Sequence, residues 1–119
     1  MLARAHRLRR SEEIARAVRR GRRASTATLT VHAERGEDPP RPARVAFVVS
    51  KAVGDAVTRN RVKRRLRHAA AAALPGLPAG CDLVVRAKPA AARASFVELA
   101  ADLGRALRQV DTRQPLESR

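Results

Sequence analysis

The stretch KAVGDAVTRNRVKRRLR, residues 51–67, carries the clearest structural signal in this chain of 119 residues. Six of the nine side chains from Arg59 to Arg67 are cationic. Apolar residues nevertheless recur through and beyond the stretch at the spacing of one helix face: Val62, Leu66, Ala69 and Ala73. This combination predicts a helix that buries one side in a domain and presents its cationic side to a polyanion.

The segments on both sides of this helix are typical of strands. The helix itself is expected over residues 56–74, with Asp55 as its N-cap and Pro75 in its stop. Residues 44–50 (RVAFVVS) and 81–87 (CDLVVRA) are mostly apolar and rich in β-branched side chains, as buried strands are. A strand–helix–strand crossover is therefore predicted around the cationic helix.

A further helix is predicted towards each end of the chain. Residues 11–21 (SEEIARAVRRG) indicate a short helix with Ser11 as N-cap and Gly21 as its end. Ser95 and Glu98 have the capping-box spacing that opens a helix. That last helix has an apolar face: Phe96, Leu99, Leu103, Leu107 and Val110.

The residues between the first helix and the first buried strand indicate more strands. Residues 26–33 alternate between apolar and polar side chains, which predicts a half-buried strand with Thr28, Thr30 and His32 on its open face. Residues 22–25 give a weak signal for an edge strand, and residues 34–43, with three prolines, predict a loop. This order of elements predicts an α+β sandwich, a sheet with helices packed on it.

Composition restricts the kind of partner and the compartment. A net charge of +15 and a pI of about 11.9 favour a polyanion, most often nucleic acid. Cys81 is the only cysteine, which excludes an intramolecular disulfide and a cysteine cluster for zinc. No apolar run approaches the roughly 18 residues of a membrane span, and the basic N-terminus lacks the apolar part of a signal peptide. We therefore expect one cytoplasmic domain over residues 1–119, with a frayed tail over residues 112–119.

Residues 50–67 closely resemble the signature of the bacterial ribonuclease P protein component. The resemblance continues through residues 6–14 (HRLRRSEEI) and residues 82–90 (DLVVRAKPA), so it covers nearly the whole chain. It implies a two-layer α/β sandwich with three helices, a mixed sheet of about four strands and a flexible arm over residues 1–10. It also implies a left-handed β-α-β crossover, as in a related ribosomal-protein domain, where general rules favour a right-handed one.

The resemblance also implies a function. Members of the family join a catalytic RNA, and the assembly removes the 5′ leader from precursor tRNA. The chemistry would belong to the RNA and its Mg²⁺, so we expect no catalytic residue, cofactor or metal ligand on this chain and a monomer in a 1:1 complex. The residues expected to bind the catalytic RNA are Arg7, Arg9, Lys51, Arg59, Asn60, Arg61, Lys63, Arg64 and Arg67. Those expected to bind the leader are Ile14, Val18, Thr28, Thr30 and His32.

Residue chemistry leaves two points of this assignment open. Asn60 can both donate and accept hydrogen bonds, so it either contacts RNA or fixes the start of the helix. Ile14, Val18 and His32 stand where relatives often carry aromatic residues, and the chain has no Tyr or Trp. Base stacking on the leader is therefore expected to be weak, and His32 either stacks or forms a hydrogen bond.

Three other functions fit part of the pattern. A ribosomal or RNA-chaperone protein would share the basic helix but would not explain the long signature together with the N-terminal arm. A helix-turn-helix DNA-binding protein needs a second helix at turn spacing, whereas strands flank this one. A free-standing nuclease needs converging carboxylates for metal ions, and the 11 acidic residues are scattered along the chain.

Overall fold

The computed structural model describes residues 7–8, 10–35, 42–77 and 79–111. Arg9, most of the predicted arm and the predicted tail lie outside these residues. The described elements are α1 (Ser11–Arg20), β1 (Arg22–Ser25), β2 (Leu29–Arg35), β3 (Arg44–Val48), α2 (Ala56–Ala73), β4 (Cys81–Ala87) and α3 (Phe96–Val110). Two short 3₁₀ helices, η2 (Leu74–Gly76) and η3 (Pro89–Arg93), flank β4.

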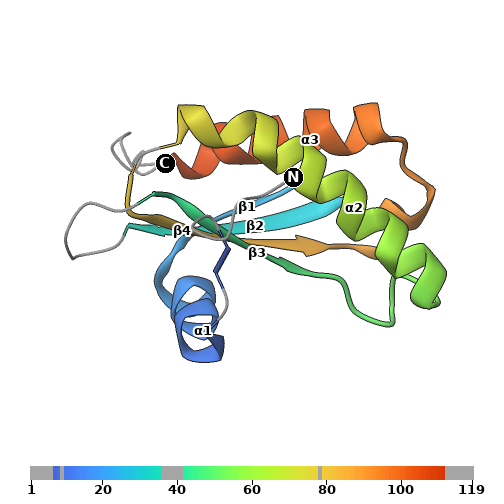
Figure 1. Ribbon diagram of the computed structural model, residues 1–119, viewed down its shortest axis with the longest axis horizontal. Helices are drawn as coiled ribbons and strands as arrows, with labels where there is room; N and C mark the ends of the chain where they lie inside the picture. Colours follow the sequence, from blue (N-terminus) through green and yellow to red (C-terminus); the bar gives the residue numbers. More distant parts are fainter. Residues whose placement is uncertain (1–6, 9, 36–41, 78, 112–119) are drawn as a thin grey trace.

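The four strands form one mixed sheet in the order β1-β2-β4-β3. The β1–β2 and β2–β4 pairs are antiparallel, and β3 and β4 are parallel neighbours joined through α2. Helices α2 and α3 pack on one face of the sheet, and α1 packs on the other (Figure 1). The predicted α+β fold and its strand–helix–strand unit are confirmed, with α1 as an addition on the far side of the two main layers.

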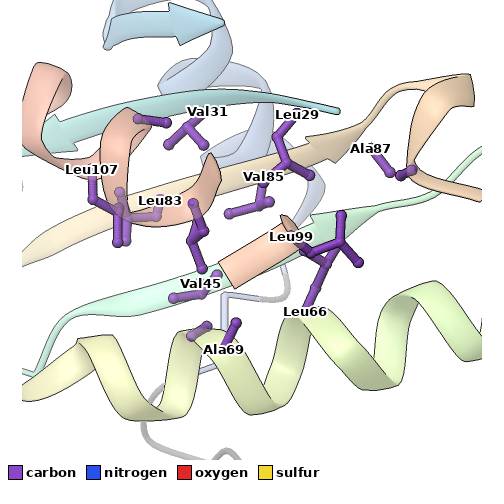
Figure 2. Packing of buried hydrophobic residues seen from close by; sticks show 14 of the residues in the cluster. Leu29, Val31, Val45, Leu66, Ala69, Leu83, Val85, Ala87, Leu99 and Leu107 are labelled. Atoms are coloured by element: carbon purple, nitrogen blue, oxygen red, sulfur yellow. The ribbon is translucent and has the colours of Figure 1, made fainter. Parts of the chain in front are cut away.

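The main core fills the space between the sheet and helices α2 and α3. Alternate residues of the strands point into it, among them Leu29 and Val31 of β2 and Val85 of β4. Leu66 of α2 and Leu99 of α3 meet them from the helical side and are fully buried, as Figure 2 shows. The period-2 and period-3.6 patterns of the sequence therefore meet in one apolar layer.

A smaller cluster lies between α1 and the opposite face of the sheet. Its buried members are Leu8, Ala17, Ala46 and Val84, and Ile14, Val18 and Val48 pack against it. Ion pairs fasten α1 beside this cluster, because Arg44 bridges Glu13 at 3.1 Å and the buried Asp82 at 3.0 Å. A second pair joins Arg16 of α1 to Glu34 of β2 at 3.0 Å.

The entry into α1 differs from the sequence-based prediction. The helix begins at Ser11, so Arg10 occupies the cap position and makes no side-chain cap hydrogen bond. The prediction of Ser11 as N-cap was therefore wrong by one residue. Gly21 does end the helix, and its lack of a side chain matters: a Cβ there would lie 2.5 Å from the carbonyl oxygen of Ala17 and 2.6 Å from that of Ala33.

The strand predicted over residues 26–33 is displaced along the chain. It begins at Leu29 and continues to Arg35, so Glu34 lies in the strand and not in the predicted loop. Before it, Thr26 closes a turn by accepting from the Leu29 amide with its hydroxyl and donating its own amide to the Leu29 carbonyl. This turn exposes Ala27, which had been expected on the apolar face.

Three further boundaries or faces differ by small amounts. Strand β3 ends at Val48, two residues before its predicted end, and α2 gives way to η2 after Ala73. Phe96 was expected on the buried face of α3 but is 43% exposed, because it occupies the first helical position beyond the edge of the core. The other predicted members of that face are buried: Leu99, Leu103, Leu107 and Val110.

Candidate RNA-binding surfaces

The cationic helix α2 begins with a well-formed cap. Asp55 accepts a hydrogen bond from the Thr58 amide at 2.9 Å, as predicted. Hydrogen bonds from Thr58 lower the pKa of the Asp55 carboxyl group, and the nearby Arg61 and Arg59 lower it further. The cap thus fixes where the helix starts and which way each following cation points.

One flank of α2 uses its arginines within the fold. Arg61 donates to the Ala92 carbonyl at 3.1 Å, and Arg65 donates to the Ala94 carbonyl at 2.7 Å. Both acceptors belong to η3 or to the residue that follows it. Arg61 was among the residues expected to bind the catalytic RNA, although helical spacing places Arg61 and Arg65 on the side of α2 away from Lys63 and Arg67. Spacing alone could not supply their partners, which come from about 30 residues further along the chain.

The other side of α2 carries cations without such partners. Asn60, Arg64 and Arg67 are exposed, Lys63 is half-buried, and none forms a hydrogen bond or ion pair with the described part of the chain. The exposed Lys51 lies in the turn after β3. We call Asn60, Lys63, Arg64 and Arg67 the outer face of α2. Asn60 donates to no loop within residues 42–77, so the loop-fixing alternative loses its support.

Arg59 and Arg7 are the two other described arginines that were expected to bind the catalytic RNA and do not belong to the outer face as defined. Arg59 is half-buried, and its Nε atom is inaccessible and has no partner among the described residues. Arg7 is exposed beside the edge of β3, where it forms a parallel bridge with Val45, and the next amide, that of Leu8, donates to the Val45 carbonyl at 3.0 Å. Arg7 thus lies apart from the outer face of α2, whereas Arg59 lies on α2 itself, one helical turn before Lys63.

The residues expected to bind the leader divide between the two faces of the sheet. Ile14 and Val18 pack on the α1 side, and Thr30 and His32 face the same side because His32 pairs with Val84 of the α1 cluster. Thr28 is the exception, since its hydroxyl donates to Asp102 of α3 at 2.5 Å. The turn before β2 breaks the period-2 alternation, so the prediction that Thr28 shares this face was wrong.

His32 is more enclosed than the predicted open face implied. Its residue is only 6% exposed, Thr30 is 7% exposed, and the Nδ1 atom of His32 is buried with no partner among the described residues. Burial lowers the pKa of His32, and the positive charges of Arg86 and Arg23 lower it further. The imidazole is therefore neutral near neutral pH.

Sequence reasoning missed two arginines that lie near His32 on neighbouring strands. Arg23 of β1 is paired directly with His32, and Arg86 of β4 is paired with Thr30. Pairing Ser25 with Thr30 in a hairpin would have placed Arg23 opposite His32. Residues 22–25 gave too weak a strand signal for that pairing to be predicted. Lys88 was also missed as a structural residue: its ammonium group donates to the Ser25 hydroxyl at 2.6 Å and to the Thr26 carbonyl at 2.5 Å.

Several acidic side chains of the described residues serve local structure. Glu98 and Ser95 form the predicted capping box of α3, and Asp102 accepts from Thr28 and pairs with Arg105. Across residues 7–8, 10–35, 42–77 and 79–111, no cluster of three or more His, Cys, Asp or Glu side chains is arranged to hold a metal ion. Among the helices described, none is long and apolar enough to span a membrane.

Comparisons with known proteins agree with this geometry. The family model described as Ribonuclease P matches residues 2–111. A ribonuclease P protein component from Nocardioides sp. is 57% identical over 111 residues, covering 92% of this chain and 95% of that protein. The one from Streptomyces bikiniensis is 50% identical over 117 residues, with the same coverage of 92% and 95%.

Solved structures with lower sequence identity share the fold. The RNase P protein from Staphylococcus aureus gives a TM-score of 0.80 at 22% identity, covering 91% of this chain and 99% of that one. The RNase P protein from Thermotoga maritima gives a TM-score of 0.72 at 22% identity, covering 83% and 92%. With the matched family model and relatives of this similarity, the chain belongs to the ribonuclease P protein family.

Proposed function

We propose that this chain is the RNA-binding subunit of ribonuclease P, the ribonucleoprotein that removes the 5′ leader from precursor tRNA. It binds the catalytic RNA through the outer face of α2 and the leader across the α1 side of the sheet. It contributes no catalytic group or metal ligand, and it lowers the Mg²⁺ concentration at which the RNA cleaves. It acts as one protein copy per RNA, in the cytoplasm.

The division of cations on α2 is the observation that carries the proposal. Arg61 and Arg65 are held by backbone carbonyls, whereas Arg64 and Arg67, three and two positions away, point outward without partners in the described chain. Adjacent like charges on one helix face destabilise the helix unless something neutralises them. RNA phosphates would do so, and the release of their counterions would strengthen binding.

The proposed magnesium effect rests on electrostatic reasoning. A protein of net charge +15 reduces the repulsion where two RNA molecules crowd together, so less Mg²⁺ is needed to screen it. The capping and ion-pair roles of Glu13, Asp55 and Asp82 support the proposal that bond cleavage belongs to the RNA. If the leader lies across the α1 side of the sheet, His32→Ala should weaken binding of precursor tRNA and leave binding of mature tRNA unchanged.

Reconstitution with a ribonuclease P RNA tests the proposal. At limiting Mg²⁺, the protein should stimulate cleavage of precursor tRNA, and the Arg64→Ala/Arg67→Ala variant should bind the RNA about tenfold or more weakly. The slope of log K against log salt should also decrease by about 1 for each lost phosphate contact. The matched control is Arg35→Ala/Arg108→Ala, which removes two exposed arginines from β2 and α3.

Two outcomes would contradict separate parts of the proposal. RNA binding without stimulated cleavage would favour a ribosomal or chaperone role. An identical loss of affinity in the α2 variant and the control would mean that total charge, and not the outer face of α2, determines binding.

A further inference from the structure

By strand register, Arg23, His32 and Arg86 are neighbours on the α1 side of the sheet, where the two arginines are exposed and His32 is buried. The strand register places Arg23 directly beside His32, and it places Arg86 beside Thr30, one diagonal step from His32. Cross-strand neighbours have Cβ atoms about 5 Å apart and diagonal ones about 7–8 Å, within reach of long arginine side chains. Helix α1 lies beneath one end of this face only (Figure 1), the end where Arg44 holds Glu13 and Asp82.

These three side chains have no compensating partners within the described chain. Arg23 and Arg86 are exposed and form no ion pair or hydrogen bond with residues 7–8, 10–35, 42–77 or 79–111. His32 is only 6% exposed, and its buried Nδ1 atom has no partner among the described residues. A buried polar atom without a partner is destabilising unless a ligand or a water molecule completes it.

Charges on the surrounding elements leave the centre of this group positive. The carboxylates nearest along the same face, Glu34 and Asp82, are paired with Arg16 and Arg44 respectively. Lys88 is held by the turn after β1, and α1 turns its apolar residues Ile14 and Val18 towards the sheet. The two uncompensated arginines also account for part of the lowered pKa of His32.

We propose that Arg23, His32 and Arg86 form a subsite for a phosphodiester group of the leader. The inference rests on the proposed function and makes it more specific: this chain holds the leader by its backbone and not by stacking its bases. Two guanidinium groups bind the nonbridging oxygens, and the ring of His32 supplies one hydrogen bond between them. The bound anion also offsets the field of the two arginines, so His32 takes up a proton more readily in the complex.

The choice of a phosphodiester over a base follows from the side chains present. The only aromatic residues are Phe47 and Phe96, neither of which belongs to this group, so a base would find a single imidazole edge and no stacking surface. Two arginines bind the charged backbone equally well whatever the base sequence. The subsite therefore predicts affinity that depends on leader charge and is insensitive to leader sequence.

The test uses the assembled holoenzyme, precursor tRNA and mature tRNA. The Arg23→Gln/Arg86→Gln variant should bind precursor about tenfold more weakly, and mature tRNA and the catalytic RNA as before. Arg35→Gln is the control, because Arg35 is an exposed arginine of β2 that faces the opposite side of the sheet. Both arginines of the test variant are exposed, so the fold should survive, and circular dichroism checks this.

A chemically altered leader provides the second arm. Two precursors, both with 2′-O-methyl leader nucleotides, are compared. One has phosphodiester linkages in its leader, and the other has uncharged methylphosphonate linkages. The uncharged leader should weaken wild-type binding about tenfold and should not weaken the double variant further. Abasic leader nucleotides should leave wild-type affinity unchanged.

Each contrary result has a distinct meaning. If wild-type holoenzyme binds precursor and mature tRNA equally, the leader role in the proposed function fails. If the precursor preference persists but ignores the arginine changes and the uncharged linkages, the subsite fails and the function stands. If the variant instead loses affinity for the catalytic RNA, the phosphate belongs to that RNA, and the proposal of a leader subsite is overturned.

Discussion

The two faces of the sheet are built for different purposes. Under α2 and α3, the buried layer is mostly apolar and includes Leu66, Leu99 and Val31, with Thr28 and Asp102 as a buried hydrogen-bonded pair. On the α1 side, four buried apolar residues share the surface with buried His32 and Asp82 and with exposed arginines. A large apolar layer stabilises the fold, while a small one leaves polar groups near the surface, where a ligand can reach them.

Removing a large side chain from the main core should give the largest effect. Leu66→Ala leaves a cavity in a fully buried position and should lower the free energy of unfolding by about 2–5 kcal/mol. Val18→Ala on the α1 side, where the side chain is half-buried, should lower it by about 1 kcal/mol. Urea unfolding in sulfate buffer measures both. Equal losses would show that the two faces contribute alike.

Breaking the ion pairs beneath α1 should have the next largest effect. Arg44→Ala removes both bonds from Arg44 to the buried Asp82 carboxylate and the one to Glu13, so stability should fall by about 1–3 kcal/mol. Arg44→Lys keeps the charge but not the paired geometry, so its stability should lie between that of Arg44→Ala and that of the wild type. Unchanged urea midpoints in both variants would mean that apolar packing alone holds α1.

The same contrast can be sharpened within α2. Arg65→Ala takes the donor from the Ala94 carbonyl and should reduce stability by about 0.5–1.5 kcal/mol. Arg64→Ala, on the outer face, should change stability by less than about 0.5 kcal/mol while weakening RNA binding. The assignment of the two flanks would be reversed if Arg64→Ala were the less stable variant.

The smallest expected effect is a pH dependence from His32. Its pKa in the fold lies below the ordinary value of 6.5, so on acidification the unfolded chain takes up a proton before the folded chain does. Stability should therefore decrease as pH falls below about 6.5, through the interval between the two pKa values. The fall in urea midpoint from pH 7.5 to about pH 5 should be smaller in His32→Gln. An identical fall in both proteins would assign the acid sensitivity to other groups.

Local patterns in the sequence were enough to predict much of the fold. Asp55 and the Ser95–Glu98 pair are caps that act within one helical turn, and both are present. Boundaries that depend on contacts distant in sequence were less predictable. Thr28 faces α3 because Thr26 closes a turn and Asp102 accepts its hydroxyl, and no periodicity within residues 26–33 contains that information.

The candidate surfaces were predictable to the same extent. Periodicity separated Arg64 and Arg67 from Arg61 and Arg65, because a helix face depends only on spacing along the chain. The group around His32 depends on the register between β1, β2 and β4. Lys88, directly after β4, also bonds the turn between β1 and β2. Arg23 and Arg86 could therefore be recognised only once the strands were paired.

The two borders of the sheet also bear on how this protein behaves at high concentration. A strand border with unpaired amides and carbonyls can recruit another chain and begin aggregation. At the β3 border, residues 7 and 8 already occupy backbone groups of Val45. At the β1 border, Arg22 and Arg23 place like charges on any second copy that approaches. Self-association through the sheet should therefore be resisted at both borders. At β3 the backbone groups of Val45 are already bonded, and at β1 the arginines repel a second copy. Only the repulsion at β1 should weaken as salt is added.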